Sequence, residues 1–218
     1  MKTLIVQKKS GKDSKKWEKY IVYVILVLIL IGVVIAIPIV YSTGRQPDTT
    51  IDQNATNIST DNECTQPMKI TNVYHLENQE PFPYKFHSFL YRPSVILKKV
   101  LLIFGFRHDV SSWSLDKISF VDTTINVDKI EDGDFENNYL RKQYDQCILS
   151  NTRSSFSDIL FDIPYSGDFY YNDQTKVGMT YLTQPIDVIG GRYYNISFYI
   201  ENRGYPENYF VLLVGAIN

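Results

Sequence analysis

The sequence predicts an all-β sandwich domain that follows one N-terminal transmembrane helix. Three features predict it: a long uncharged apolar run near the N-terminus, a polar segment after it, and many short apolar runs from about residue 68 onward. The short runs are rich in Val, Ile, Phe and Tyr, and turn-forming residues separate them, which is typical of strands joined by turns. Without tail and anchor, roughly 160 residues remain, enough for one domain.

The apolar run covers residues 20–41, which are 22 residues without a charge. A helix of that length, at about 1.5 Å per residue, crosses the roughly 30 Å hydrocarbon core of a bilayer. Residues 1–19 hold seven lysines, and only Arg45 is basic between the run and Lys69. Positive residues stay in the cytosol, so we expect an uncleaved type II single-pass anchor with the C-terminal domain extracellular or lumenal. A cleaved signal peptide is the alternative, but its apolar core is usually about 7–15 residues long.

Charge is distributed unevenly along the chain. The formal net charge is −2, and residues 1–19 contribute +5, so the rest of the chain carries −7. An acidic exterior argues against a nucleic-acid partner, which requires clustered Lys and Arg. The lipid bilayer is the expected partner of the N-terminal part. The basic tail either only sets the topology or also binds anionic lipid headgroups.

Residues 42–66 are polar, with few apolar residues, and predict a flexible stalk between anchor and domain. The stalk contains two N-glycosylation triplets, which begin at Asn54 and Asn57. The chain has two cysteines, Cys64 and Cys147. Outside the cell they are expected to form one disulfide, and two unpaired thiols are the alternative.

Two strands stand out in the predicted domain, residues 67–218. In residues 193–200 the two-residue period places Ile196, Phe198 and Ile200 on one face and Asn195, Ser197 and Tyr199 on the other. Asn195 begins a third glycosylation triplet and is expected to point outward. Residues 100–107 begin with apolar residues on both faces, which predicts a central strand covered on both sides.

Four motifs in residues 123–218 occur in the order found in one family of sandwich modules. They are Asp132-Gly-Asp-Phe-Glu136, Pro164-Tyr-Ser-Gly-Asp-Phe-Tyr170, Leu182-Thr-Gln184 followed by Gly190-Gly191, and Ser197-Phe-Tyr199. This segment resembles the first two-thirds of a galactose-binding-like β-sandwich, the jelly roll of many carbohydrate-binding modules. The resemblance implies a jelly-roll fold for the domain.

The motifs of that family's last strands lie upstream instead, as Phe104-Gly-Phe-Arg-His-Asp109 and Trp113-Ser-Leu-Asp-Lys-Ile118. Residues 67–122 thus resemble the end of a module and residues 123–218 its beginning. Either the chain is a fragment of a tandem array, or the two segments complete one another as a circularly permuted sandwich. Half a sandwich exposes a sheet face and open edges, so the permuted sandwich is the physically favoured reading.

The resemblance also implies a structural calcium ion held by Glu136 and Asp116. Hard oxygen ligands suit Ca²⁺, which needs about six to eight of them. The sequence departs from the family at Lys117, where a second Asp is usual. An ammonium group there would repel the ion, so an ordinary ion pair between Lys117 and a nearby carboxylate is the alternative. No other cofactor is expected.

Sugar binding uses exposed aromatic rings together with amides and carboxylates that bind hydroxyl groups. The candidate rings, which the sequence places in loops, are Trp113, Tyr170, Tyr171 and Tyr205. Trp113 also fits a core position. Tyr170 and Tyr171 are adjacent, so on a strand only one of the two can point outward.

The sequence carries no catalytic motif, so we expect no enzyme. His75, His87 and His108 share no metal-binding spacing, and neither a nucleophile elbow nor a nucleotide loop is present. Three functions remain open: a surface-displayed binding module for glycans, a structural or adhesive ectodomain that contacts proteins, and a non-functional fragment of a module array. The oligomeric state does not follow from the sequence.

Overall fold

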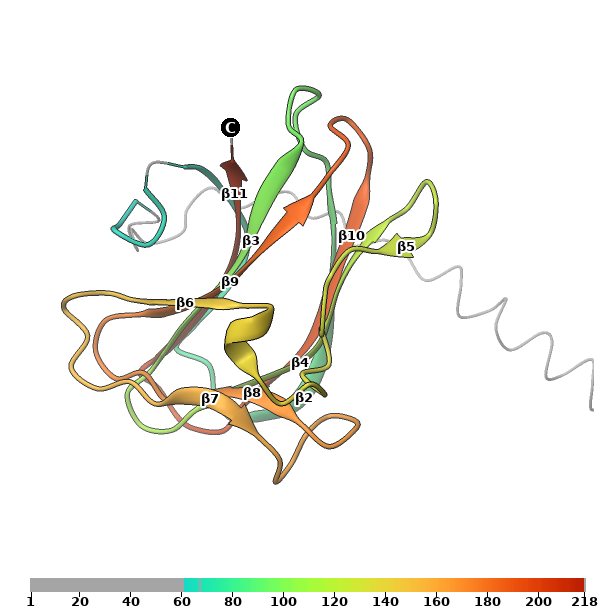
Figure 1. Ribbon diagram of the computed structural model, residues 1–218. Coiled ribbons are helices and arrows are strands. Elements are labelled where there is room, and N and C mark those ends of the chain that lie inside the picture. The colour runs from blue at the N-terminus through green and yellow to red at the C-terminus, as the bar shows by residue number, and fades with distance from the viewer. Residues whose placement is uncertain (1–60, 67, 218) are drawn as a thin grey trace, which may run out of the picture. The chain divides into compact units, whose positions relative to one another are not determined.

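The domain is an antiparallel β-sandwich of two sheets packed face to face, and it is compatible with a jelly roll (Figure 1). The structure is a computed structural model that describes residues 61–66 and 68–217. The predicted tail, the predicted span over residues 20–41 and most of the predicted stalk lie outside these residues. None of the helical structure in the described part is long and apolar enough to cross a bilayer.

Within the described residues the first sheet has five strands. Their order is β1 (Lys69–Glu77), β11 (Asn208–Ile217), β3 (Lys99–His108), β9 (Thr180–Asp187) and β6 (Asp145–Ile148). The second sheet has the order β2 (Phe82–Tyr91), β10 (Tyr194–Asn202), β4 (Trp113–Asp122), β8 (Tyr170–Asp173) and β7 (Ser157–Leu160). The short strand β5 (Val127–Asp128) pairs with β4, and one 3-10 turn, η1 (Leu140–Lys142), precedes β6.

In both sheets the first four strands come alternately from the two halves of the domain. In the first sheet β3 lies between β11 and β9, and in the second β10 lies between β2 and β4. Phe104 of β3 therefore has Leu212 on one side and Leu182 on the other. Residues 68–122 and 123–217 thus build one pair of sheets and not two separate half-sheets. This is the arrangement expected of halves that complete one another.

The core explains why these strands form where they do. Ile196, Phe198 and Ile200 point into the space between the sheets and are fully buried, as their two-residue period predicts. The expectation for residues 100–107 is also confirmed. Phe104 belongs to the core between the sheets, whereas its neighbour Ile103 belongs to a second cluster on the outer face of the first sheet.

Residues 61–66 form a turn that packs against this second cluster. Cys64 is joined to Cys147 of β6 by a disulfide bond, with the two Cα atoms 5.7 Å apart. The side-chain amide of Asn62 donates a 3.0 Å hydrogen bond to the Tyr181 hydroxyl, and Thr65 is buried. The folded domain therefore begins before residue 67, the predicted boundary, because the cross-link and these contacts hold the end of the predicted stalk on the sheet.

Candidate binding surface on the second sheet

Strand β2 forms the edge of the second sheet, and its alternation presents a polar and aromatic face to solvent. Phe89 and Tyr91 pack against the core, whereas Phe86, Ser88 and Leu90 point away from it. Phe86 is 56% exposed, although large apolar rings usually lie inside. On the neighbouring strand, Tyr199 is paired with Phe86, and the two ring centroids lie 5.2 Å apart.

A third ring comes from the loop between β7 and β8, residues 161–169. Tyr165 of this loop stacks on Tyr199 with the centroids 3.5 Å apart and the planes 16° apart, and it meets Tyr84 edge-on at 5.8 Å. The pKa of Tyr199 is raised, first by the hydrogen bond between Tyr199 and Tyr165 and second by burial. We call Tyr84, Phe86, Tyr165 and Tyr199 the aromatic face.

Polar side chains border the aromatic face on the same side of the sheet. The Ser88 hydroxyl donates a 2.8 Å hydrogen bond to the Asn195 amide oxygen. One strand further, the hydroxyls of Ser119 and Ser197 lie 2.8 Å apart. Exposed rings next to hydroxyl and amide groups can stack on the apolar side of a sugar ring and bind its hydroxyls.

Two carboxylates hold the loop that carries Tyr165. Asp116 of β4 accepts a 3.1 Å hydrogen bond from the backbone N–H of Ser166. One oxygen of Glu136 accepts hydrogen bonds from the backbone N–H groups of Asp168, at 2.9 Å, and Phe169, at 3.2 Å. Gly167, which lies between Ser166 and Asp168, has a φ of +80°. A Cβ at this position would lie 2.1 Å from the same Glu136 oxygen. Glycine therefore lets the loop close onto the carboxylate.

These contacts argue against the predicted calcium site at Glu136 and Asp116. Both side chains face one loop, but backbone N–H groups occupy both oxygens of Asp116 and one oxygen of Glu136. Burial raises the pKa of Asp116 to about 6, and Lys117 pairs at 3.3 Å with Asp134. Within residues 61–66 and 68–217, no three His, Cys, Asp or Glu side chains are grouped so that they could hold a metal ion. The residues present therefore fit a loop anchor and not a calcium site.

Arg203 holds the first part of the loop at residues 161–169 against the sheet. Its guanidinium donates to Glu201 at 2.8 Å, to the Tyr170 hydroxyl at 3.0 Å and to the Ile163 carbonyl at 3.3 Å. The same group lies over the Tyr170 ring, 4.9 Å from its centroid. Tyr170 also hydrogen-bonds Asp162, and burial raises its pKa to about 12.

Three of the four rings predicted to bind sugar are buried, which corrects the expectation that they lie exposed in loops. Trp113 packs in the core, and its indole N–H donates to the Arg107 carbonyl at 2.9 Å. Tyr171 faces the core, and the side-chain amide of Gln146 donates to its hydroxyl at 3.2 Å. Tyr170 points the other way but lies beneath Arg203. Tyr205 is 63% exposed and lies in the β10–β11 loop, outside the aromatic face.

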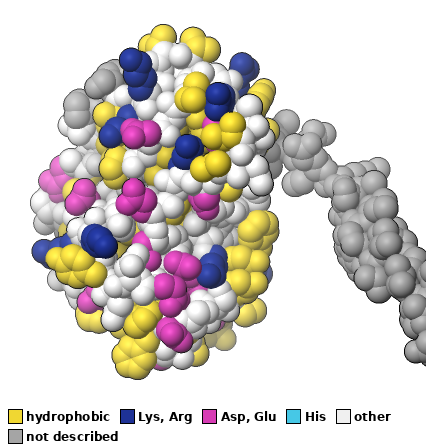
Figure 2. Space-filling view, turned by 45° about the vertical axis from the view of Figure 1, so that its right-hand side comes forward, with side chains coloured by type: hydrophobic (Ala, Val, Ile, Leu, Met, Phe, Trp, Pro, Cys, Tyr) yellow, Lys and Arg dark blue, Asp and Glu magenta, His cyan; other side chains and the backbone are white. Residues whose placement is uncertain are grey.

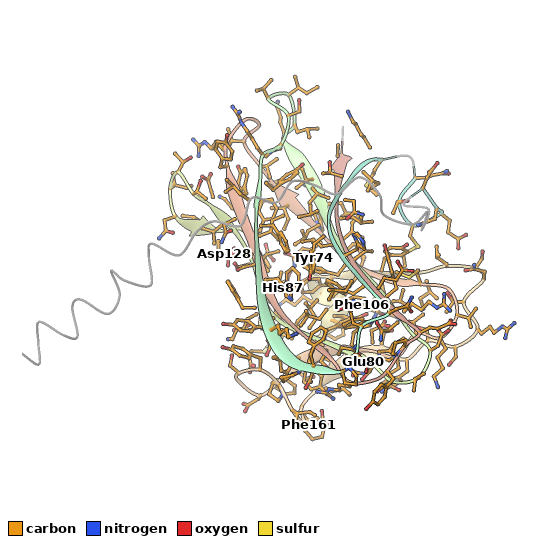
Figure 3. The ribbon with its side chains drawn as sticks, turned by 180° about the vertical axis from the view of Figure 1, so that it is seen from behind. Tyr74, Glu80, His87, Phe106, Asp128 and Phe161 are labelled. Atoms are coloured by element: carbon orange, nitrogen blue, oxygen red, sulfur yellow. A yellow bond between two sulfur atoms is a disulfide. The ribbon has the colours of Figure 1, made fainter. Side chains whose placement is uncertain are left out.

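The histidines occupy three separate places. His108 is buried, accepts a 3.0 Å hydrogen bond from the Ser111 N–H at Nδ1, and donates from Nε2 to the Asn202 amide oxygen at 2.8 Å. His87 lies between the sheets, with its ring centroid 4.9 Å from that of Tyr74 (Figure 3). His75 stacks on Tyr209 at 6.3 Å. Each environment is that of a packed side chain.

The predicted glycosylation sites divide between described and undescribed residues. Asn195 lies on the outer face of β10 beside the aromatic face, as its alternation predicts. Asn54 and Asn57 lie outside the described residues.

Sequence reasoning overlooked the aromatic face. The only local indication of it was in residues 82–91, where aromatic rings occur at odd and at even positions and therefore on both faces of a strand. Such a pattern means that some rings must face solvent or a partner. No family model matches the chain, and it has no match among the curated proteins or the solved structures.

Proposed function

We propose that this chain is a membrane-anchored extracellular binding module whose ligand class is glycan. The observation that carries the proposal is the aromatic face, in which Phe86, Tyr199 and Tyr165 adjoin the hydroxyl and amide groups of Ser88 and Asn195. Stacking on an exposed ring and hydrogen bonds to neighbouring polar groups are what recognition of a sugar requires. The predicted anchor over residues 20–41 and the resemblance to carbohydrate-binding modules support the same function.

The surface favours a ligand that lies along the sheet over one that enters a deep pocket. A hollow with a volume of about 240 Å³ lies elsewhere, lined by Lys129, Arg141 and Tyr144 among others. The aromatic face runs across β2 and β10 to the loop at residues 161–169. An open row of rings suits several consecutive units of an oligosaccharide.

The test is glycan-array binding by the full chain in detergent, followed by calorimetry on the best ligand. Phe86→Ala and Tyr165→Ala are each expected to weaken binding about five- to thirtyfold, because loss of one stacking contact costs on the order of 1–2 kcal/mol. Tyr205→Ala, which removes an equally exposed ring outside the face, is the matched control. Binding that survives both substitutions would place the ligand elsewhere. Absence of any glycan ligand would favour the protein-contacting alternative.

Asn195 imposes one condition on this experiment. Its side chain lies beside Ser88, so a glycan attached there would stand on the proposed surface. The chain should therefore be made both without glycosylation and as Asn195→Gln in a glycosylating host. If the proposal is right, the unglycosylated chain binds most strongly and glycosylated wild type most weakly. Asn195→Gln lies between them, because it removes the glycan but also displaces an amide that borders the aromatic face.

A further inference from the structure

Two crossover loops at one end of the sandwich form a compact projection that the proposed function does not use. The β2–β3 loop, residues 92–98, leads from the second sheet to the first, and the β9–β10 loop, residues 188–193, leads back. Figure 1 shows both loops projecting at the end of the domain where β11 finishes. We call these two loops the tip.

The two loops hold each other in place. The Gly191 N–H donates to the Pro93 carbonyl at 2.9 Å, and the Val188 N–H donates to the Lys98 carbonyl at 2.9 Å. A Cβ on Gly190 would lie 2.4 Å from the Ser94 carbonyl oxygen, so glycine permits this close approach. The tip is therefore a braced structure and not a pair of independent loops.

This braced structure presents aliphatic side chains to solvent. Val95 is 75% exposed and Ile96 is 79% exposed, and Ile189 of the other loop is exposed as well. Their neighbours Leu97 and Val188 are buried and close the end of the core. The loops thus bury some of their aliphatic residues and hold others outward, a pattern typical of an interaction surface.

The exposed aliphatic residues are accompanied by cations, although the chain beyond residue 19 is acidic overall. Arg92 and Lys98 are exposed on the tip, and Arg92 lies over the ring of Tyr193, 5.1 Å from its centroid. Lys99, directly after the tip, pairs with Asp187 at 3.3 Å, and Arg192 of the tip pairs with Asp122 at 3.0 Å. Figure 2 shows hydrophobic and basic side chains together at the top of the domain, whereas acidic side chains predominate lower down.

Strand β1 begins at this same end. Lys69, the first residue of β1, pairs with Ala216, and Ala216 pairs on its other side with Val100, directly after the tip. The turn at residues 61–66 precedes β1, and the Cys64–Cys147 bond holds it on the outer face of the first sheet.

We propose that the tip docks on the surface of the lipid bilayer, with Val95, Ile96 and Ile189 reaching into the boundary between headgroups and acyl chains. Apolar side chains on convex loops can enter this layer, Arg92 and Lys98 can meet lipid phosphates, and Tyr193 suits the interfacial region. This inference rests on the membrane anchorage in the proposed function. Docking would hold the domain at the membrane through the end that carries the tip and orient its outer faces.

The test places a fluorescent probe on the tip of the full chain reconstituted into phosphatidylcholine vesicles with one-fifth phosphatidylserine. Ile96→Cys is labelled with an environment-sensitive dye, and Tyr205→Cys, an exposed site at the opposite end of the sandwich, is the matched control. We expect a blue shift and quenching by lipids with a brominated acyl chain at position 96, and neither effect at position 205. Adding Val95→Asp and Ile189→Asp to the Ile96→Cys chain should abolish both effects.

Failure of docking and failure of anchorage give different results. A chain that does not float with the vesicles after an alkaline wash would contradict the anchor, and with it the basis of the docking proposal. A chain that floats but whose probe at position 96 is neither shifted nor quenched overturns the docking proposal alone. A probe that changes only when a second protein is added would assign the tip to a protein partner and also overturn it.

Discussion

The ring of Tyr165 lies flat on the ring of Tyr199, with centroids 3.5 Å apart, and this contact joins an irregular loop to a central strand of the second sheet. Tyr199 in turn contacts Phe86 on the edge strand β2. The loop at residues 161–169 is therefore part of the aromatic face, and the face depends on how that loop is anchored.

Substitution of Gly167 should loosen this anchor. Gly167→Ala places a Cβ at positive φ and against the Glu136 carboxylate, so we expect a loss of about 1–3 kcal/mol in the free energy of unfolding. Hydrogen exchange at the amides of Ser166, Asp168 and Phe169 should accelerate. Asp168→Ala is the control, because it keeps the backbone N–H that Glu136 accepts. Unchanged exchange in Gly167→Ala would show that Glu136 does not hold the loop.

Substitution of Phe104 can show whether the two halves of the domain unfold as one cooperative unit. Its ring is buried and contacts Phe198 of the second sheet at 5.5 Å and Phe210 of β11 at 6.3 Å. We expect Phe104→Ala to destabilise the domain by about 3–5 kcal/mol, with one unfolding transition by both circular dichroism and fluorescence. Phe161→Ala, which truncates an exposed ring, should change little. Two separate transitions would contradict a single sandwich.

His87 should make stability depend on pH. Burial first, and then the charge of Lys85, lower its pKa below the ordinary 6.5, so the folded state binds the proton less readily than the unfolded state. Stability is therefore lost as the pH falls through about 6.5. The other titratable group in contact with the imidazole is Tyr74, which stays neutral because burial raises its pKa to about 12.

Two buried carboxylates act in the opposite sense, so the effect of His87 is best measured as a difference. Burial raises the pKa of Asp116 and of Asp173 to about 6, which adds stability as the pH falls from that value. The difference in unfolding free energy between wild type and His87→Phe should therefore be followed from pH 8 to pH 5. It should shift in favour of the variant below about 6.5, and a flat difference would mean that His87 titrates alike in both states.

The bond between Cys64 and Cys147 should contribute to stability, because it closes a long loop of the chain and fixes the turn at residues 61–66. Reduction should cost about 2–5 kcal/mol in the free energy of unfolding. The double substitution Cys64→Ser and Cys147→Ser should lower stability by a similar amount and make it insensitive to reductant. Equal stability of the oxidised and reduced wild type would contradict this.

The predicted topology can be tested on intact cells. Because seven lysines precede an uncharged run at residues 20–41, protease added outside should digest the C-terminal domain and spare a tag at the N-terminus. A cytosolic marker protein controls for leakage. Protection of the C-terminal domain would refute the type II orientation.

Those parts of the fold that depend on local alternation could be predicted from the sequence. Ile196, Phe198 and Ile200 face the core because a strand alternates its side chains, whatever it pairs with. Residues 100–107 could be predicted as a strand covered on both faces for the same reason, because apolar residues occupy odd and even positions alike. The two-sheet sandwich follows from many such strands.

The candidate site could not be predicted in the same way, because it depends on contacts between distant segments. Tyr170 and Tyr171 are both buried, since β8 has the core on one side and Arg203 on the other. Nothing near Tyr170 in the sequence indicates that Arg203 covers it. Tyr165 likewise gains its place beside Tyr199 only through the hydrogen bonds of its loop to Asp116 and Glu136.

The position of β11 has a consequence for biosynthesis. This strand, Asn208–Ile217, lies between β1 and β3, and its pairing with β1 is the only ladder that β1 makes within the described sheets. During synthesis the first sheet therefore cannot close until β11 has emerged, and until then the apolar faces of β1 and β3 stay exposed. A nonsense codon that removed β11 would leave the first sheet without the strand that joins β1 to β3. Cellular protein quality control should recognise such a chain.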